Sequence, residues 1–231
     1  MSIIFFDFDG TITKRDTTDA VLEAFAMPPW QEIEEDWVAG RIGSRECMTR
    51  QLALVRASRA DLNSLLDSLE IDEHFLSLLE YCEQHSVAVH IISDGFDYFI
   101  SRILNRKSLG LKRALSQMTI SSSHLEFQNG RIVTSFPFYH EGCQHGCATC
   151  KPAVMKSLNS HDEPTIFVGD GLSDRFAVGA ADVVFAKSKL LSFCREEGIS
   201  CFEYEDMSEV LSWMERRELP EWSGVLAQAT A

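Results

Sequence analysis

Two carboxylates near the start of the chain have a spacing that suits paired catalytic roles. Asp7 and Asp9 follow the apolar run of residues 2–6 and stand immediately before Gly10. Once a turn at the glycine bends the chain, both side chains can face one crevice, where one carboxylate attacks an electrophile and the other transfers protons. An isolated Asp-x-Asp at a strand end is more often a turn or a solvated edge, so this interpretation depends on further partners.

Polar residues recur directly after two later apolar runs, and a lysine lies between them. They are Ser93-Asp94-Gly95 after the second run, Asp170 and Asp174 after the third, and Lys151. A hydroxyl and backbone amides can donate hydrogen bonds to a phosphoryl group, and a lysine can neutralise it. Each residue also has an ordinary interpretation as a helix cap or a surface cation. All of these ordinary interpretations would have to hold together for the site to be absent.

The acidic residues imply a divalent cation. Asp7, Asp9 and Asp170 would bring three carboxylates together, and at an effective dielectric constant near 20 each pair about 4 Å apart repels by roughly 4 kcal/mol. Three such pairs approach the ~5–15 kcal/mol by which a domain is stable, so a cation is required. Oxygen ligands favour Mg²⁺. A carboxylate nucleophile, a proton donor and a cation together suit the hydrolysis of phosphate monoesters, which are very inert without help.

The apolar runs predict the strands that position these residues. They alternate with helical periodicity, which is typical of an α/β fold with a Rossmann-like parallel sheet and helices on both faces. The predicted strands are residues 2–8, 87–92, 165–168, 182–186 and 199–204, and the predicted helices between them are residues 96–104, a helix from about 174, and 190–197. Because open parallel sheets bind ligands at the carboxyl ends of their strands, we expect Asp7, Ser93 and Asp170 to converge there.

Two segments fall outside this alternation. Residues 17–81 show helical periodicity with interruptions at Pro28-Pro29 and at residues 40–43, whereas residues 116–150 predict a hairpin that turns at Asn129-Gly130 and leads into a cysteine-containing loop. We therefore expect a core domain of residues 1–14 and 84–231, with a helical cap of residues 15–83 inserted into it. The residues after about 220 lack periodicity, and we expect them to fray.

The motifs resemble, in order and in strand context, those of the haloacid dehalogenase superfamily of phosphohydrolases. The four matching segments are Asp7-Phe8-Asp9-Gly10-Thr11-Ile12-Thr13, Ser93-Asp94-Gly95, Lys151, and Val168-Gly169-Asp170-Gly171-Leu172-Ser173-Asp174. The resemblance implies a magnesium-dependent phosphatase in which Asp7 forms an aspartyl-phosphate and Asp9 is the general acid and base.

The same resemblance implies a role for each remaining motif residue. Mg²⁺ would be held by the side chains of Asp7 and Asp170 and by the backbone carbonyl of Asp9, with Asp174 in support. The phosphoryl oxygens would be bound by Ser93, by the backbone of Asp94 or Gly95, and by Lys151, which would also keep Asp7 ionised.

A helical cap between the first two motifs resembles that of the phosphoserine-phosphatase-like subfamily. Within it, Cys143-x3-Cys147-x2-Cys150 before the lysine looks like the cysteine cluster of the 2-hydroxy-3-keto-5-methylthiopentenyl-1-phosphate phosphatases of methionine salvage. Asp16 sits where phosphoserine phosphatases bind substrate through a glutamate. Gln51 falls where their substrate-binding arginine is expected, although Arg50 is adjacent and remains a candidate. Phosphoserine, phosphocholine and phosphoethanolamine stay open as alternative substrates, as does a phosphotransferase or phosphomutase using the same nucleophile.

Two groups of residues outside the motifs have several interpretations. The three cysteines could bind zinc together with His140 or His145, form a redox pair, or serve packing. Trp30 and Trp37 in the cap are interpreted as helix packing rather than as part of a substrate site.

The composition limits the partners of the protein. A net charge of -14 and a pI near 4.9 argue against a nucleic-acid-binding surface. The sequence has no signal-peptide pattern and no apolar run of membrane-spanning length, so we expect a cytoplasmic protein without a membrane partner. Seven cysteines without a secretion signal predict reduced thiols rather than a disulfide framework. The expected partner is a small phosphorylated metabolite, and the oligomeric state is left open.

Overall fold

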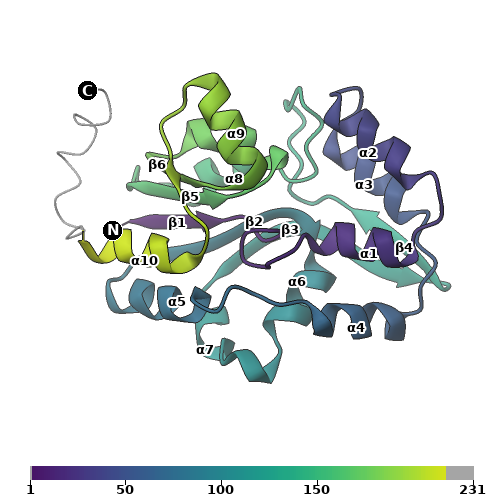
Figure 1. Ribbon diagram of the computed structural model, residues 1–231, viewed down its shortest axis with the longest axis horizontal. Helices are drawn as coiled ribbons and strands as arrows, with labels where there is room; N and C mark the ends of the chain where they lie inside the picture. Colours follow the sequence, from purple (N-terminus) through teal and green to yellow (C-terminus); the bar gives the residue numbers. More distant parts are fainter. Residues whose placement is uncertain (1, 217–231) are drawn as a thin grey trace.

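The computed structural model describes residues 2–216, built around a seven-stranded sheet in the order β4-β3-β2-β1-β5-β6-β7 (Figure 1). The strands are β1 (Ile3–Phe6), β2 (Ala88–Phe96), β3 (Thr119–Gln128), β4 (Arg131–Ser135), β5 (Thr165–Gly169), β6 (Val183–Ala186) and β7 (Phe202–Glu203). Neighbouring strands are parallel except β3 and β4, which form the predicted antiparallel hairpin. The α/β fold expected from the sequence is confirmed.

β1 is the central strand because it is apolar on both faces. Ile3 and Phe5 belong to one buried cluster and Ile4 and Phe6 to another, as the alternation of side chains along a strand requires. The first cluster includes side chains of α8 (Lys151–Leu158) and α9 (Ser188–Glu197); the second includes those of α5 (Phe75–Gln84), α6 (Asp97–Leu104) and α10 (Met207–Arg216). Figure 1 shows these two groups of helices on opposite sides of the sheet.

The strand register brings the predicted motifs to one edge. Phe6, the last residue of β1, pairs with Ile91 of β2 and with Val168 of β5. The residues that follow these positions therefore lie side by side at the carboxyl edge of the sheet. This register places Asp7 between the segments that contain Ser93 and Asp170.

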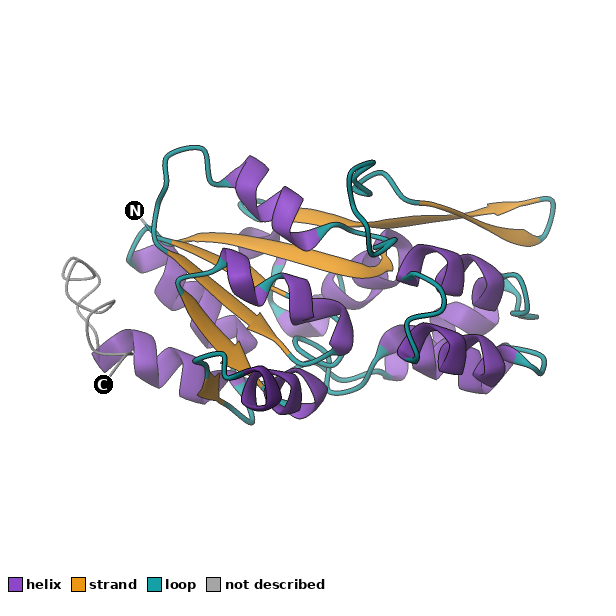
Figure 2. Cartoon of the chain, turned by 90° about the horizontal axis from the view of Figure 1, so that it is seen from above, coloured by secondary structure: helices purple, strands orange, loops and turns teal. Residues whose placement is uncertain are grey.

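Four helices form a layer beyond this edge: α1 (Thr17–Phe25), α2 (Trp30–Val38), α3 (Ser44–Leu52) and α4 (Arg59–Ser68). α2 contacts α3, α1 contacts α4, and α4 rests on α6 of the core. The β3–β4 hairpin extends beyond the rest of the sheet along these helices, and β4 contacts α3 (Figure 2).

The chain enters and leaves the helical layer through two adjacent segments. Thr13 and Ile71 form an antiparallel bridge, the amide of Lys14 donates to the carbonyl of Glu70 (3.0 Å), and the amide of Asp72 donates to that of Ile12 (2.8 Å). α5 follows this crossing and packs on β2 and α10. We therefore propose that the cap comprises about residues 14–71 and that α5 belongs to the core. The cap expected from the sequence instead extends to residue 83 and contains α5.

The structure differs from the predicted elements at several places. β2 continues through Ser93 to Phe96, with a register shift against β3. The helix expected from about residue 174 is instead two 3₁₀ turns, η2 (Leu172–Phe176) and η3 (Val178–Ala180), because the Asp174 carboxylate accepts the amides of Asp170 and Gly171 and tightens the turn.

Two helices, α8 and α10, were not among the elements predicted from the sequence. Short helical segments at η1 (Lys107–Leu109) and α7 (Lys112–Leu115) complete the described elements. The expectation for the residues after 220 concerns a part of the chain outside residues 2–216. Within that described range, the helices fall short of the length and apolar character that a bilayer crossing needs.

Candidate active site

A buried lysine joins two aspartates at the carboxyl edge of the sheet. Lys151 is the first residue of α8 and is 1% exposed. Its Nζ donates to Asp7 Oδ1 at 2.6 Å and also to Asp174 Oδ1. Burial acts to lower the pKa of Lys151, but the carboxylates of Asp174 and Asp7 outweigh it and raise this pKa above its ordinary value. The lysine is therefore a permanent cation beneath Asp7.

Asp7, Asp170 and Asp174 form an acidic group that could hold a metal ion. One carboxylate oxygen from each residue lies within 4.8 Å of the other two, and within residues 2–216 no other three His, Cys, Asp or Glu side chains are so arranged. Burial, and then the charge of Asp174, raises the pKa of Asp170 to about 7. Burial is also the largest cause that raises the pKa of Asp7. Carboxylates in this situation are stabilised by a cation.

The hydrogen bonds divide this acidic group into two roles. Asp174 bonds Lys151 through one oxygen and two backbone amides (3.0 Å each) through the other. Asp7 and Asp170 each accept one side-chain hydrogen bond, Asp170 from Thr11 at 3.0 Å, and each keeps one oxygen without a partner among the described residues. The donor set therefore fits an oxygen-liganded cation between Asp7 and Asp170, with Asp174 as the residue that orients Lys151.

Asp9 is held apart from this group by hydrogen bonds to its charged form. Its Oδ1 accepts the amide (3.0 Å) and the hydroxyl of Thr17, and its Oδ2 lies 3.4 Å from the hydroxyl of Ser93. Burial raises the pKa of Asp9 and outweighs the Thr17 hydrogen bonds, which lower it. A raised pKa suits a carboxyl group that must deliver a proton. A Cβ at Gly95 would lie 2.1 Å from Asp9 Oδ2, so only glycine lets Asp9 approach β2.

Ser93 and Asp94 both line the pocket, but their side chains have different hydrogen-bond partners. The Ser93 hydroxyl lines the pocket and accepts the Gly95 amide at 2.9 Å. The Asp94 carboxylate instead accepts the Ser44 hydroxyl (2.6 Å) and the Thr149 amide (2.8 Å), and the Ser44 hydroxyl in turn accepts the Ala148 amide at 2.9 Å. The Asp94 side chain therefore connects the cap to the loop before Lys151.

The two further substrate-binding candidates lie in different surroundings. Asp16 caps α1, accepts the Asp19 amide at 2.8 Å and lines the pocket; burial raises its pKa well above the ordinary value. Arg50 projects to the exposed side of α3, where it pairs with Glu46 (3.3 Å) and Asp36 (3.9 Å). The structure therefore does not support substrate binding by Arg50, because consecutive helical residues point about 100° apart and Gln51 takes the inward position.

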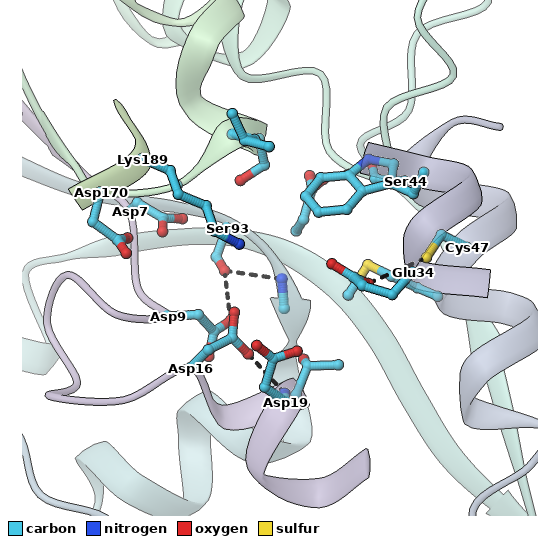
Figure 3. A pocket seen from close by; sticks show the side chains of 18 of the residues that line it. Asp7, Asp9, Asp16, Asp19, Glu34, Ser44, Cys47, Ser93, Asp170 and Lys189 are labelled. Carbon is cyan, nitrogen blue, oxygen red and sulfur yellow. Dashed lines mark hydrogen bonds between the residues drawn. The ribbon is translucent and has the colours of Figure 1, made fainter. Parts of the chain in front are cut away.

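The pocket between the sheet edge and the cap has a volume of about 210 Å³ (Figure 3). Trp37 lines it, so the interpretation of this residue as packing alone was wrong; Trp30 packs against the core cluster as expected. Sequence reasoning also missed Glu34 and Ser44 from the cap and Lys189 from α9, which all line the pocket. These residues belong to no local motif: Glu34 and Ser44 reach the site only through the docking of the cap, and Lys189 through the position of α9.

The cysteine loop touches the cap but does not present a metal site. Cys143, Cys147 and Cys150 are free thiols, and the metal-competent group of residues 2–216 does not include them. Burial acts to raise the pKa of Cys143, but the backbone amides of Cys147 and His145 and the neighbouring thiols lower it overall. His145 stacks on Phe176 at 3.9 Å between ring centroids. This geometry favours a packing role, or a redox role for Cys143, over zinc.

We expect Gly43→Ala to loosen the docking of the cap on this loop. A Cβ at Gly43 would lie 2.4 Å from the carbonyl oxygen of Gly146, which also accepts the Arg45 amide at 3.1 Å. Because the clash is with backbone, the variant should lose about 1–3 kcal/mol of unfolding free energy, and kcat/KM should fall with it. Gly179→Ala is the matched control, since a Cβ there has nothing within 4 Å. Equal denaturation curves for the two variants would show that the contact does not matter.

The chain is similar to known proteins over most of its length. The model of the haloacid dehalogenase-like hydrolase family matches residues 4–177. The 2-hydroxy-3-keto-5-methylthiopentenyl-1-phosphate phosphatases of Bacillus pumilus and Bacillus velezensis are 27% and 28% identical, over 95% and 92% of this chain and 94% and 89% of their own lengths.

Solved structures of similar fold include phosphatases. A phospho-aspartyl intermediate analogue of phosphoserine phosphatase has a TM-score of 0.67 at 17% identity, covering 91% of this chain and 97% of that chain. A haloacid dehalogenase family hydrolase from Salmonella enterica has a TM-score of 0.70 at 22% identity, covering 94% of this chain and 72% of that one. At these identities the likeness concerns the fold.

Proposed function

Because this chain belongs to the haloacid dehalogenase-like hydrolase family and is a phosphatase, we propose that it hydrolyses a small phosphate monoester through an aspartyl-phosphate on Asp7, with Mg²⁺ as cofactor. The observation that supports this most strongly is the buried Asp7, paired with Lys151 and grouped with Asp170 and Asp174, in a pocket that Asp9 also lines. Nucleophile, proton donor and charge compensation then lie within one site.

The chain's own residues account for both displacements. An oxygen of Asp7 attacks phosphorus, the ester oxygen–phosphorus bond breaks, and Asp9 gives its proton to the departing oxygen. Asp9 then takes a proton from a water molecule, which attacks the phosphorus and releases inorganic phosphate from Asp7. The Ser93 hydroxyl, which is oriented by the Gly95 amide, binds a phosphoryl oxygen, and Lys151 keeps Asp7 ionised. Mg²⁺ held by Asp7, Asp170 and the Asp9 carbonyl would neutralise charge on the phosphoryl group.

The substrate that we propose is 2-hydroxy-3-keto-5-methylthiopentenyl-1-phosphate. The relatives with this name match nearly the full length of the chain. Phosphoserine is less well supported, because the pocket lining within the described residues contains no arginine, the side chain that best clamps a carboxylate. Gln51 occupies the corresponding part of the wall and is 2% exposed.

Phosphate release should depend on Mg²⁺. With a panel of this enolic phosphate, phosphoserine, phosphocholine and phosphoethanolamine, we expect one compound to be strongly preferred, and chelation of the metal to slow its hydrolysis by about 10²–10³-fold. Added Mg²⁺ should restore the rate. Equal rates in chelator and in Mg²⁺ would contradict the proposed cofactor, and phosphoryl transfer to another alcohol instead of water would indicate a phosphotransferase.

A further inference from the structure

The cap side of the pocket is acidic. Asp16 and Asp19 at the start of α1 and Glu34 on α2 line it, and Lys189 is the one basic side chain among the described lining residues. Trp37 and Met48 supply an apolar surface beside these groups. The leaving group of a substrate, which projects away from Asp7 toward the cap, therefore meets three carboxylates and a single lysine within the described part of the chain.

Glu34 is oriented within this wall by a buried partner. Its Oε2 accepts Gln51 Nε2 at 2.9 Å and lies 3.8 Å from the thiol of Cys47. Its Oε1 has no hydrogen-bond partner among residues 2–216. Figure 3 shows the Glu34 carboxylate directed into the pocket from the cap side, opposite the group on the sheet side that includes Asp9 and Ser93.

The hydrogen bond from Gln51 stabilises the charged, accepting form of Glu34 against its burial. Burial, together with the charge of Asp19, raises the pKa of Glu34 overall, and the hydrogen bond from Gln51 and the charge of Lys189 oppose this rise. Because Gln51 is buried, the pair cannot swing out to solvent without breaking its hydrogen bond. A half-buried acceptor with one open oxygen is satisfied by a donor on a ligand, and it repels a ligand carboxylate.

We infer that Glu34 is a specificity-determining residue of this phosphatase, whose free oxygen accepts a hydrogen bond from a hydroxyl or ammonium on the leaving group and whose charge excludes carboxylated leaving groups. The inference rests on the proposed function, since it assumes that phosphate occupies the Asp7 end of the pocket. It assigns the substrate to phosphate monoesters of neutral or cationic, donor-bearing alcohols.

The test compares Glu34→Gln with Glu35→Gln, a neighbour on the exposed side of α2 that does not line the pocket. The readout is the ratio of kcat/KM for a donor-bearing substrate to that for phosphoglycolate, whose leaving group carries a carboxylate. Phosphoethanolamine provides an ammonium donor, and the enolic phosphate a hydroxyl donor. We expect this ratio to fall by about 10–100-fold in Glu34→Gln and to stay at the wild-type value in Glu35→Gln.

The outcomes separate this inference from the proposed function. If the wild-type protein releases phosphate from p-nitrophenyl phosphate with Mg²⁺ but Glu34→Gln leaves the ratio unchanged for both donor substrates, the inference is wrong and the phosphatase assignment stands. A ratio that changes for only one donor substrate identifies that donor as the one bound. If the wild-type protein hydrolyses none of the compounds, the proposed function itself fails. If Glu34→Gln unfolds at the same temperature as the wild-type protein, misfolding is not the cause of a changed ratio.

Discussion

Replacing Asp7 with asparagine lowers turnover by about 10⁴-fold or more, while the protein stays folded. The substitution removes the nucleophilic oxygen but keeps the volume of the side chain and a hydrogen-bond acceptor for Lys151. The free energy of unfolding should change little, because Lys151 keeps its ion pair with Asp174 and can still donate to the amide oxygen of the asparagine. Steady-state phosphate release and denaturant unfolding in chelator measure the two effects.

Asp9→Asn is the matched comparison for this prediction. Loss of the proton donor should lower the rate of hydrolysis of an alkyl phosphate by about 10²–10⁴-fold. The rate of the first step with p-nitrophenyl phosphate should fall less, because its leaving group needs no proton. With that substrate Asp9→Asn should release a burst of nitrophenol equal to the enzyme concentration and then stall as the aspartyl-phosphate, whereas Asp7→Asn should show no burst. A burst from Asp7→Asn would mean that another residue is the nucleophile.

The second large effect concerns Lys151. We expect Lys151→Met to lower kcat by about 10³-fold or more, since the substitution removes the cation that holds Asp7 ionised. In chelator it should also lower the free energy of unfolding by about 3–5 kcal/mol, because Asp7 and Asp174 are left buried without their counter-charge. Methionine preserves the length of the side chain, so the loss would not come from a cavity.

Two further variants make this prediction specific. Lys156→Met changes an exposed lysine on the same helix and should alter the free energy of unfolding by no more than about 0.5 kcal/mol. Adding Asp7→Asn to Lys151→Met should recover part of the lost stability, since one of the two orphaned carboxylates is removed. Strictly additive losses in the double variant would argue that the two side chains do not interact as the 2.6 Å contact indicates.

Local sequence patterns determined the sheet and the residues at its carboxyl edge. Ile3 to Phe6 form a continuous apolar run, which allows β1 to be buried on both faces. The register of Phe6 with Ile91 and Val168 follows once three apolar strands pair in parallel. Asp7 and Asp170 therefore come together because each directly follows a strand. Periodicity and turn residues contain this information, since both act over a few neighbouring positions.

Only the tertiary structure decided how the cap meets this edge. Sequence spacing could not show that Gln51 rather than Arg50 faces inward, because both fit the same helix until the docked surface selects one side. Nor could it show the hydrogen bond from Ser44 to Asp94, which joins positions 50 residues apart on different elements. The wall formed by Glu34 and Gln51 has the same origin: it depends on the packing of α2 against α3, a long-range contact that leaves no periodic signal in the chain.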